Sequence, residues 1–420
     1  MAKKRSPWSF IPTQYFAEGL PYILVNNLSV AMYKSLEASN AFIGMTSFLY
    51  IPWSIKFLWG PYVDANKTKR RWVLLMQICL AILFGVIALG IQIPNALLIS
   101  LVIFTLIAFI SATHDIATDG FYLHVLNKKD QAFFTGIRST FYRLSMIFGG
   151  GILVAVAGYF GDLSGAVTHG WSIAFFISAG IFLVMFLYHK WILPYPATDL
   201  PVRDTNKDIS SIPFAKVFKE YFSQKSIGVI LAYILLYRLG EGMLVKMAQP
   251  FLMDDASKGG LGISLSGVGI MYGTFGVIAL VIGGILGGWL IKKYSLKKLI
   301  WIMAFAMNLP NLLYVYMAYF KPGTTLIQGC IIFEQFGYGL GFTAFMVYLL
   351  YISRGKFKTS HYAISTGIMA LGMMLPGFIS GFLQQQVGYL WLFILSFIFT
   401  IPGMLTIFFL PFYEKNEDGI

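Results

Sequence analysis

The sequence predicts an all-α membrane protein with about twelve transmembrane helices. Of its 420 residues, 57% are hydrophobic and only 12% are charged, and a soluble domain carries about twice that share of charged residues. Many apolar runs reach the roughly 20 residues that a helix needs to span a bilayer. A membrane β-barrel would instead show alternating segments of about ten residues, so the long continuous runs predict helices.

The expected spans are separated by short polar breaks and one long one. The long break, residues 194–225, contains four prolines among charged residues and is predicted to be a cytoplasmic linker. It divides the chain into an N-terminal half, 1–193, and a C-terminal half, 226–420, each with six helices. The predicted spans are 8–33, 41–63, 72–92, 96–126, 131–160, 171–193, 226–253, 264–291, 297–319, 324–351, 360–386 and 389–412.

The distribution of Lys and Arg along the chain indicates how the protein is oriented in the membrane. The formal net charge is +13, and the basic residues gather in every second break, which is the positive-inside pattern. This pattern predicts that both termini and the linker are cytoplasmic, and it makes nucleic acid an unexpected partner. Cys79 and Cys330 lie far apart in apolar runs and suggest neither a disulfide nor a metal site. The basic groups lie at residues 3–5, 67–71, 128–129, 190–225, 292–298 and 354–358, and at Lys415.

The two halves resemble each other weakly. The first span contains Glu18-Gly19 and the seventh contains Glu241-Gly242. Two parallel six-helix repeats with a site between them are typical of the major facilitator architecture. Glycines at four-residue spacing predict close helix contacts within the membrane, at Gly283 with Gly287 and at Gly377 with Gly381.

Ionisable residues inside the apolar spans are the most informative feature. Each costs about 2.5–3.5 kcal/mol at a helix centre, so we expect them to pair or to line a water-filled cavity. Arg138, Lys246 and His124 stand near span ends, where they either snorkel to the interface or join the interior. The full set is Glu18, Lys56, His114, Asp115, Asp119, His124, Arg138, Arg143, Arg238, Glu241, Lys246 and Glu334.

Two ion pairs are predicted between the fourth and fifth spans. Asp115 and Asp119 are four residues apart and share a helix face. The spans form a hairpin that turns near Lys129. Counted from that turn, Asp115 has the depth of Arg143, and Asp119 has the depth of Arg138. We therefore predict the pairs Asp115–Arg143 and Asp119–Arg138, which either lock the two helices together or take part in a transport cycle.

The seventh span predicts a further polar face. Arg238, Glu241 and Gln249 follow one another at helical spacing. Arg238 and Glu241 could pair within the helix, or Glu241 could face Glu18 or Lys56 across a cavity.

Three acidic residues are candidates for proton coupling. A carboxylate held away from water can exchange a proton near neutral pH. This favours Glu18 and Glu334, and Asp119 completes the set; each could equally be an ordinary hydrogen-bonded structural residue. On the tenth span, Glu334 and Tyr338 share a face.

Six segments carry a family resemblance: EGLP at 18–21, KFLWGPYVD at 56–64, SATHDIATD at 111–119, YRL at 142–144, LYRLGE at 236–241 and FE at 333–334. In these segments, and over nearly its whole length, the chain resembles the AmpG-type muropeptide permeases. The resemblance implies a major facilitator fold in a bacterial inner membrane. It also implies proton-driven import of anhydro-muropeptides, the disaccharide-peptide fragments of the cell wall.

The expected partners are therefore a small solute, protons and the lipid bilayer, with no cofactor, no metal and a monomeric state. Glu18 and His114 depart from the family pattern, so another oligosaccharide or an amino-sugar disaccharide stays open as the solute. The residues predicted to line the substrate cavity are Lys56, Asp115, Arg143, Arg238, Glu241, Gln249 and Tyr338.

A membrane-bound acyltransferase and a channel are the alternative functional classes. His114 and Asp119 have the His-four-Asp spacing of some membrane-bound acyltransferases, in which the His acts as a base. That spacing falls here inside an apolar span, which disfavours an enzyme. Two similar halves fit alternating access better than a channel, and there is no phosphate-binding loop for nucleotide-driven transport. A secondary transporter is thus the predicted class.

Overall fold

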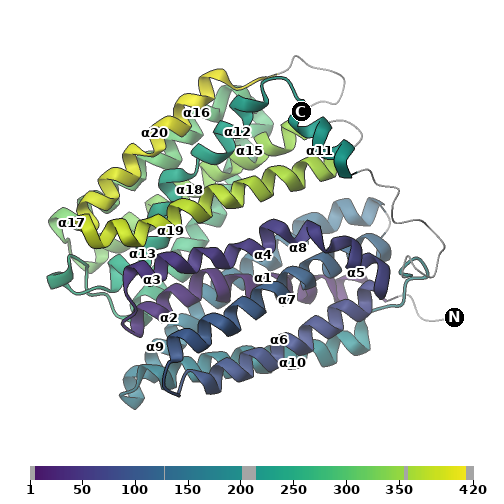
Figure 1. Cartoon of the computed structure of the whole chain (residues 1–420), viewed down its shortest axis with the longest axis horizontal. Helices are drawn as coiled ribbons and strands as arrows, with labels where there is room; N and C mark the ends of the chain where they lie inside the picture. Colours follow the sequence, from purple (N-terminus) through teal and green to yellow (C-terminus); the bar gives the residue numbers. More distant parts are fainter. Residues whose placement is uncertain (1–4, 127, 201–213, 354–357, 413–420) are drawn as a thin grey trace. The chain divides into compact units, whose positions relative to one another are not determined.

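The structure is a computed structural model that describes residues 5–126, 128–200, 214–353 and 358–412. Within these ranges every regular element is helical (Figure 1). Nine of the described helices are long and apolar enough to cross a membrane. One of the nine, residues 361–409, covers most of the last two predicted spans. α19 (Lys358–Ile398), which makes up most of this stretch, is interrupted at Gly388, where φ is +76° and the backbone is not helical, so two helices meet there. Much of the predicted linker, and the basic residues at 3–4, 354–356 and 415, lie outside the described residues.

The first of two compact units contains residues 1–36, 55–212 and 265–273. In this unit α6 packs against α7 and α10, α1 packs against α7 and α8, and α14 packs against α9. Its helices are α1 (Ile11–Ile23), α2 (Ser29–Ser35), α5 (Gly60–Asn66), α6 (Lys69–Gly90), α7 (Ala96–Val125), α8 (Lys128–Ile147), α9 (Leu153–Ser164), α10 (Val167–Ile192) and α14 (Leu265–Val268).

The second unit contains residues 37–54, 213–264 and 274–420. Here α15 and α16 pack against α18, while α13 and α3 pack against α19. The half boundaries expected from the sequence, 1–193 and 226–420, stay a prediction. The helices of this unit are α3 (Asn40–Met45), α4 (Ile51–Ile55, whose last residue belongs to the first unit), α11 (Phe214–Phe222), α12 (Ile227–Leu236), α13 (Leu239–Met253), α15 (Val277–Tyr294), α16 (Leu296–Asn308), α17 (Leu312–Phe320), α18 (Thr324–Ile352), α19 and α20 (Thr400–Thr406).

The first two predicted spans are built from short helices joined by irregular turns. Pro21 has no N–H to donate within α1, and the helix passes into the π-helical segment η2 (Leu24–Leu28) soon after it. Between α3 and α4 the chain forms the 3-10 segment η3 (Thr46–Tyr50). Irregular turns of these kinds often stand at functional sites or hinges.

Glycines allow the closest helix contacts in the second unit, as the sequence predicted. A methyl group on Gly283 of α15 would collide with the Phe336 carbonyl of α18, and one on Gly381 of α19 would collide with the Asn40 carbonyl of α3. Small residues let helix backbones approach where no hydrophobic force between helices drives association.

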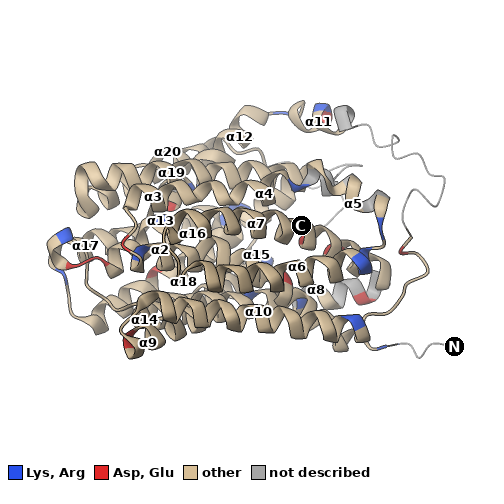
Figure 2. Ribbon diagram, turned by 60° about the horizontal axis from the view of Figure 1, so that its bottom comes forward, with Lys and Arg blue, Asp and Glu red and all other residues tan. Residues whose placement is uncertain are grey.

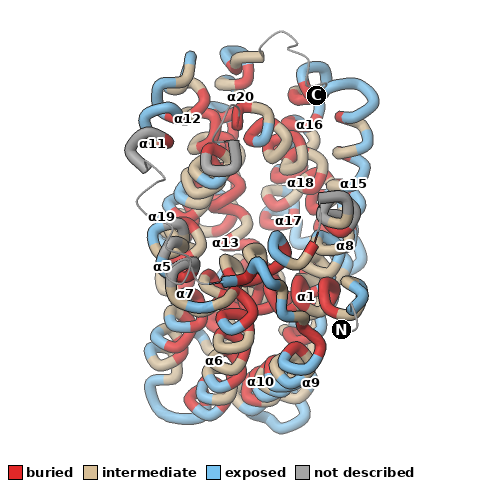
Figure 3. Tube along the Cα trace, turned by 90° about the vertical axis from the view of Figure 1, so that its right-hand side faces the viewer, coloured by how far each residue is buried: buried red, intermediate tan, exposed pale blue. Residues whose placement is uncertain are grey.

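The outer surface of the helices is apolar, as a lipid-facing surface requires. On α7 the exposed residues Leu98, Val102, Leu106 and Phe109 follow one stripe, and Figure 3 shows other helices with one buried and one exposed side. Charged residues gather mainly near helix ends (Figure 2). An exposed apolar surface of this extent indicates a membrane environment.

The chain segment that follows α10 is hydrogen-bonded to the first turn of α6. Both oxygens of Asp199 accept hydrogen bonds from the first turn of α6, at 2.6 Å from the Lys69 N–H and 3.0 Å from the Arg70 N–H. The Arg70 side chain donates in turn to the carbonyls of Lys190 and Leu193. A carboxylate at a helix N-terminus satisfies free N–H groups and favours the helix dipole.

Candidate functional site

An ionic cluster occupies the inner side of α1 and α7 in the first unit. Asp115 and Asp119 lie one turn apart on α7. Lys56, from the 3-10 turn η4 (Lys56–Leu58), places its Nζ atom 3.0 Å from Asp115 Oδ2. The Arg138 Nη1 atom of α8 lies 3.1 Å from Asp119 Oδ1. The predicted Asp119–Arg138 pair is therefore confirmed, and Asp115 has a different partner from the one expected.

The predicted pair Asp115–Arg143 is wrong, because equal depth in a hairpin is not enough for contact. Arg143 follows Arg138 by five residues, which turns its side chain by about 140° around the helix. Asp119 follows Asp115 by only four residues and stays on the same face. Since Arg138 faces α7, Arg143 points away from it and forms no ion pair with the described residues.

Tyr15 of α1 joins the second ion pair into a triangle. Its hydroxyl donates to Asp119 Oδ1 at 2.9 Å and accepts from Arg138 Nη1 at 3.0 Å. The Arg138 guanidinium also lies over the rings of Tyr15 and Tyr122, at 5.0 and 5.2 Å from their centroids. Tyr15 was not among the site residues predicted from the sequence. Its position three residues before Glu18, on the same helix face, was the available signal.

Glu18 lies beside both pairs without forming one. It is 7% exposed, and its Oε2 atom is buried with no hydrogen-bond partner in the described part of the chain. Asp115, Asp119, Lys56 and Arg138 all lie within electrostatic range of its carboxyl group. Glu18 is thus a third carboxyl group next to two cations that are already paired.

One edge of the cluster is open. The Asp119 and Arg138 side chains are 45% and 35% exposed, whereas the Asp115 side chain is 14% exposed. Charged side chains within a transmembrane span are costly against lipid. We therefore expect the exposed edge to face water.

The opposite side of α7 is held by a buried chain of hydrogen bonds. The Gln77 amide lies 3.1 Å from His114 Nε2 and 3.0 Å from His189 Nδ1, and His189 Nε2 lies 2.9 Å from Thr13 Oγ1. This chain links α7, α6, α10 and α1 behind the ionic cluster. His114 therefore faces α6, and it does not meet Asp119. The His-Asp arrangement of an acyltransferase is absent from these two residues.

The second unit holds a tighter ion pair. The helix predicted at 226–253 breaks between α12 and α13, and Arg238 stands at the break. Its guanidinium donates twice to Glu241, at 3.0 and 2.6 Å, and once to the Tyr338 hydroxyl of α18 at 2.7 Å. Both charged side chains are about 5–6% exposed. Of the two alternatives that the sequence left open for Glu241, the structure shows the pair with Arg238.

Glu334 is buried on α18 at 2% exposure. It accepts a hydrogen bond from Gln335 at 3.0 Å and lies beside the Tyr314 hydroxyl of α17. It forms no ion pair within the described ranges. Gln249 is also buried, on α13.

The three basic residues near predicted span ends differ in their surroundings. His124 is exposed near the end of α7 and contacts Thr198, as expected at a span end. Arg138 instead joins the ionic cluster. Lys246 is only 6% exposed and donates to Thr46 at 2.7 Å, so of its two alternatives the interior position is the one found.

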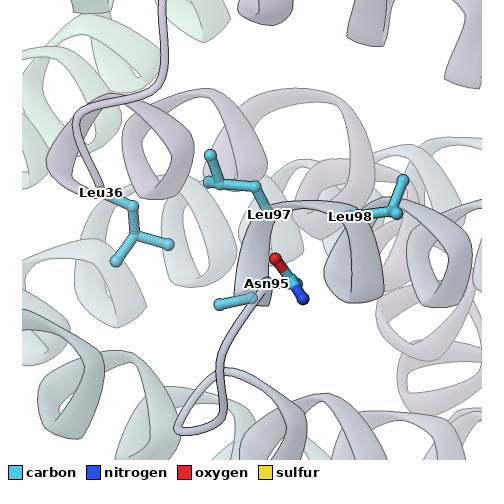
Figure 4. Close-up of a pocket in the computed structure, with 5 residues that line it drawn as sticks. Leu36, Asn95, Leu97 and Leu98 are labelled. Atoms are coloured by element: carbon cyan, nitrogen blue, oxygen red, sulfur yellow. The ribbon is translucent and has the colours of Figure 1, made fainter.

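The first unit also has a pocket of about 370 Å³ at the turn before α7, lined by Leu36 and residues 95–98 (Figure 4). It contains no charged side chain and lies apart from the ionic cluster. Among the described residues, no group of three or more His, Cys, Asp or Glu side chains could hold a metal ion.

The family model of the Major Facilitator Superfamily matches residues 14–245 and 229–419. The anhydromuropeptide permease of Escherichia coli K12 is 25% identical, over 93% of this chain and 77% of the permease. A Rickettsia bellii transporter named AmpG 1 is also 25% identical, over 87% of this chain and 88% of its own length.

Solved transporters share the fold. A bacterial homologue of the human lysosomal transporter Spinster, in an inward-facing conformation, has a TM-score of 0.73 at 15% identity. A D-xylose–proton symporter has a TM-score of 0.72 at 13% identity. In each case 95% of this chain and 95% of the other are covered. The resemblance to AmpG-type permeases is confirmed, and the chain belongs to the major facilitator superfamily of multi-pass membrane transporters.

Proposed function

We propose that this transporter imports anhydro-muropeptides, or closely related cell-wall sugar fragments, together with protons by alternating access. The relatives at 25% identity, one of them named a permease for anhydromuropeptide, support the solute class. The arrangement of buried charges in the first unit supports the proton as the coupling ion.

The observation that carries proton coupling is the position of Glu18. Lys56 and Arg138 each have a carboxylate partner, so the cluster has three carboxyl groups against two cations. An ionised Glu18 adds an uncompensated charge to a buried site, which is costly. Protonation of Glu18 removes that charge, and release of the proton restores it. Glu334 and Asp119 are the further candidates for this role.

The remaining site residues have supporting roles in the proposal. We propose that the solute contacts Lys56, Asp115 and Arg143 in the first unit, and Arg238, Glu241, Gln249 and Tyr338 in the second unit. The positive-inside pattern supports cytoplasmic termini in a bacterial inner membrane, and the transporter works as a monomer. An oligosaccharide or amino-sugar disaccharide without a peptide is the alternative solute.

The test is uptake by purified protein in liposomes with an imposed pH gradient. The panel contains an anhydro-muropeptide, its anhydro-disaccharide, diacetylchitobiose and acetyl-CoA. We expect the muropeptide to accumulate only when the outside is acidic. Solute counterflow in the same liposomes distinguishes a carrier from a channel or an enzyme.

Two variants locate the coupling site. Glu18→Gln and Glu334→Gln should lose accumulation driven by the pH gradient and keep counterflow, because exchange needs no net proton release. Each keeps the size of the side chain and removes only its charge. Normal accumulation by both variants would exclude these two residues as coupling sites.

A further inference from the structure

Lys246 stands in the middle of α13 with little contact to water. It is 6% exposed, and its Nζ atom donates to Thr46 Oγ1 of η3 at 2.7 Å. Thr46 uses its own hydroxyl proton for the Ile43 carbonyl, also at 2.7 Å. Thr46 therefore acts toward Lys246 as a neutral acceptor and leaves the positive charge uncompensated.

No carboxylate balances this charge in the described part of the chain. Lys246 is absent from the ion pairs there, and Glu241, the nearest acidic residue on α13, gives both of its oxygens to Arg238. An ammonium group has three donors, and one of them is used. Buried cations in transmembrane segments usually pair or mark a solute pathway.

A second buried polar group, next to Thr46 in the chain, has no hydrogen-bond partner in the described part of the chain. Ser47 follows Thr46 in η3, is 1% exposed, and has a buried Oγ atom without a hydrogen bond to any described residue. A Cβ atom on Gly377 of α19 would lie 2.6 Å from Ser47 Oγ and 3.6 Å from the Gly242 carbonyl. Gly242 is one turn before Lys246 on α13. Ser47 thus lies against the face of α13 that carries Lys246.

We propose that Lys246, with Ser47 and Thr46, binds a carboxylate of the transported solute. An ammonium with free donors and a hydroxyl donor match a carboxylate, because hydrogen bonds between ionised groups are about twice as strong as neutral ones. This inference rests on the proposed function. It adds that the carrier prefers acidic fragments over neutral sugars of the same size. A peptide carries at least its C-terminal carboxylate at neutral pH, so a muropeptide satisfies this requirement.

The test compares one solute in two charge states. Binding to the purified full chain in detergent is measured by calorimetry for the anhydro-disaccharide as its free carboxylic acid and as its primary carboxamide. The two solutes have nearly the same shape. We expect the wild-type protein to bind the acid at least tenfold more tightly than the amide.

In Lys246→Met this preference should fall to less than threefold, while affinity for the amide stays near the wild-type value. Lys246→Arg should keep part of the preference because it keeps the charge. Thr46→Val and Ser47→Ala retain the lysine and serve if Lys246→Met does not fold. Ser47→Ala should reduce the preference severalfold because it removes a donor to the carboxylate.

Three results would overturn the inference in different ways. Equal wild-type affinity for acid and amide removes the acid preference and leaves muropeptide import standing. If Lys246→Met keeps the full preference for the acid, other residues cause that preference. If Lys246→Met does not fold, the same conclusion follows when both Thr46→Val and Ser47→Ala keep the full preference. Failure of the wild-type protein to bind or transport any sugar of the panel refutes the proposed function, and this inference with it.

Discussion

The two units hold their buried charges in different ways. In the first unit each ion pair joins different segments, Lys56 of η4 to Asp115 of α7 and Arg138 of α8 to Asp119 of α7. The side chains of the second pair are 35% and 45% exposed. In the second unit Arg238 and Glu241 lie three residues apart at the start of α13 and are almost fully buried. A pair between helices opposes their separation, whereas a pair within one helix moves with it. A change in helix packing would therefore alter the ion pairs of the first unit and leave the pair of the second unit intact.

The largest expected effect on stability is in the second unit. Glu241→Gln leaves the Arg238 guanidinium buried without its counter-ion, which should lower the free energy of unfolding by about 3–5 kcal/mol. Denaturant unfolding of the purified chain in detergent measures this change. The double variant Arg238→Met with Glu241→Gln should recover most of the loss, since it removes the unpaired charge. A loss below about 1 kcal/mol in the single variant would show that this pair is not isolated from water.

Asp119→Asn in the first unit should have a small effect on stability and a large effect on transport. The pair with Arg138 is partly exposed, so its loss should lower the free energy of unfolding by about 1 kcal/mol or less. Transport should fall at least tenfold, because Asp119 holds both Arg138 and the Tyr15 hydroxyl beside Glu18. The two quantities are measured on the same preparation. A large loss of stability with normal transport would reverse the comparison between the units.

The smallest expected effect is at Arg143. Because Arg143 forms no ion pair with the described residues, Arg143→Met should change the free energy of unfolding by no more than about 0.5 kcal/mol. Arg138→Met on the same helix is the matched comparison and should lose transport, because it leaves Asp119 unpaired. If Arg143→Met destabilises as much as Arg138→Met, then Arg143 has a charged partner in the membrane.

The depth of a side chain along its helix could be predicted from the sequence. The direction in which the side chain points around the helix could be predicted only in part. The Asp119–Arg138 pair followed from counting residues from the hairpin turn, and the same count failed for Arg143 because five residues rotate a side chain by about 140°. The Arg238–Glu241 pair followed from spacing within one helix. Such a pair needs no knowledge of neighbouring helices.

The span boundaries were also accessible, since α7 runs from Ala96 to Val125 where 96–126 was predicted. The sequence could not reveal contacts between helices that are distant along the chain. Tyr15 and Asp119 meet across 104 residues, and Lys246 and Thr46 meet across 200. For Lys246 the sequence left two alternatives open, the interface or the interior, because hydropathy locates a span end only within a few residues. The helix break at Arg238 and the π-helical turn after Pro21 had no clear signal beyond proline and glycine.

The packing of α3 against α19 affects the order in which the protein can be built. Asn40 of α3 donates hydrogen bonds to Gln384 and Tyr389 of α19, which lie 344 and 349 residues later in the chain. At about 5–20 residues per second, a ribosome needs roughly 20–70 s to synthesise the intervening chain. During that interval Asn40, the first residue of α3, lacks these partners. Water or other contacts must satisfy its side chain until the last helices of the chain arrive.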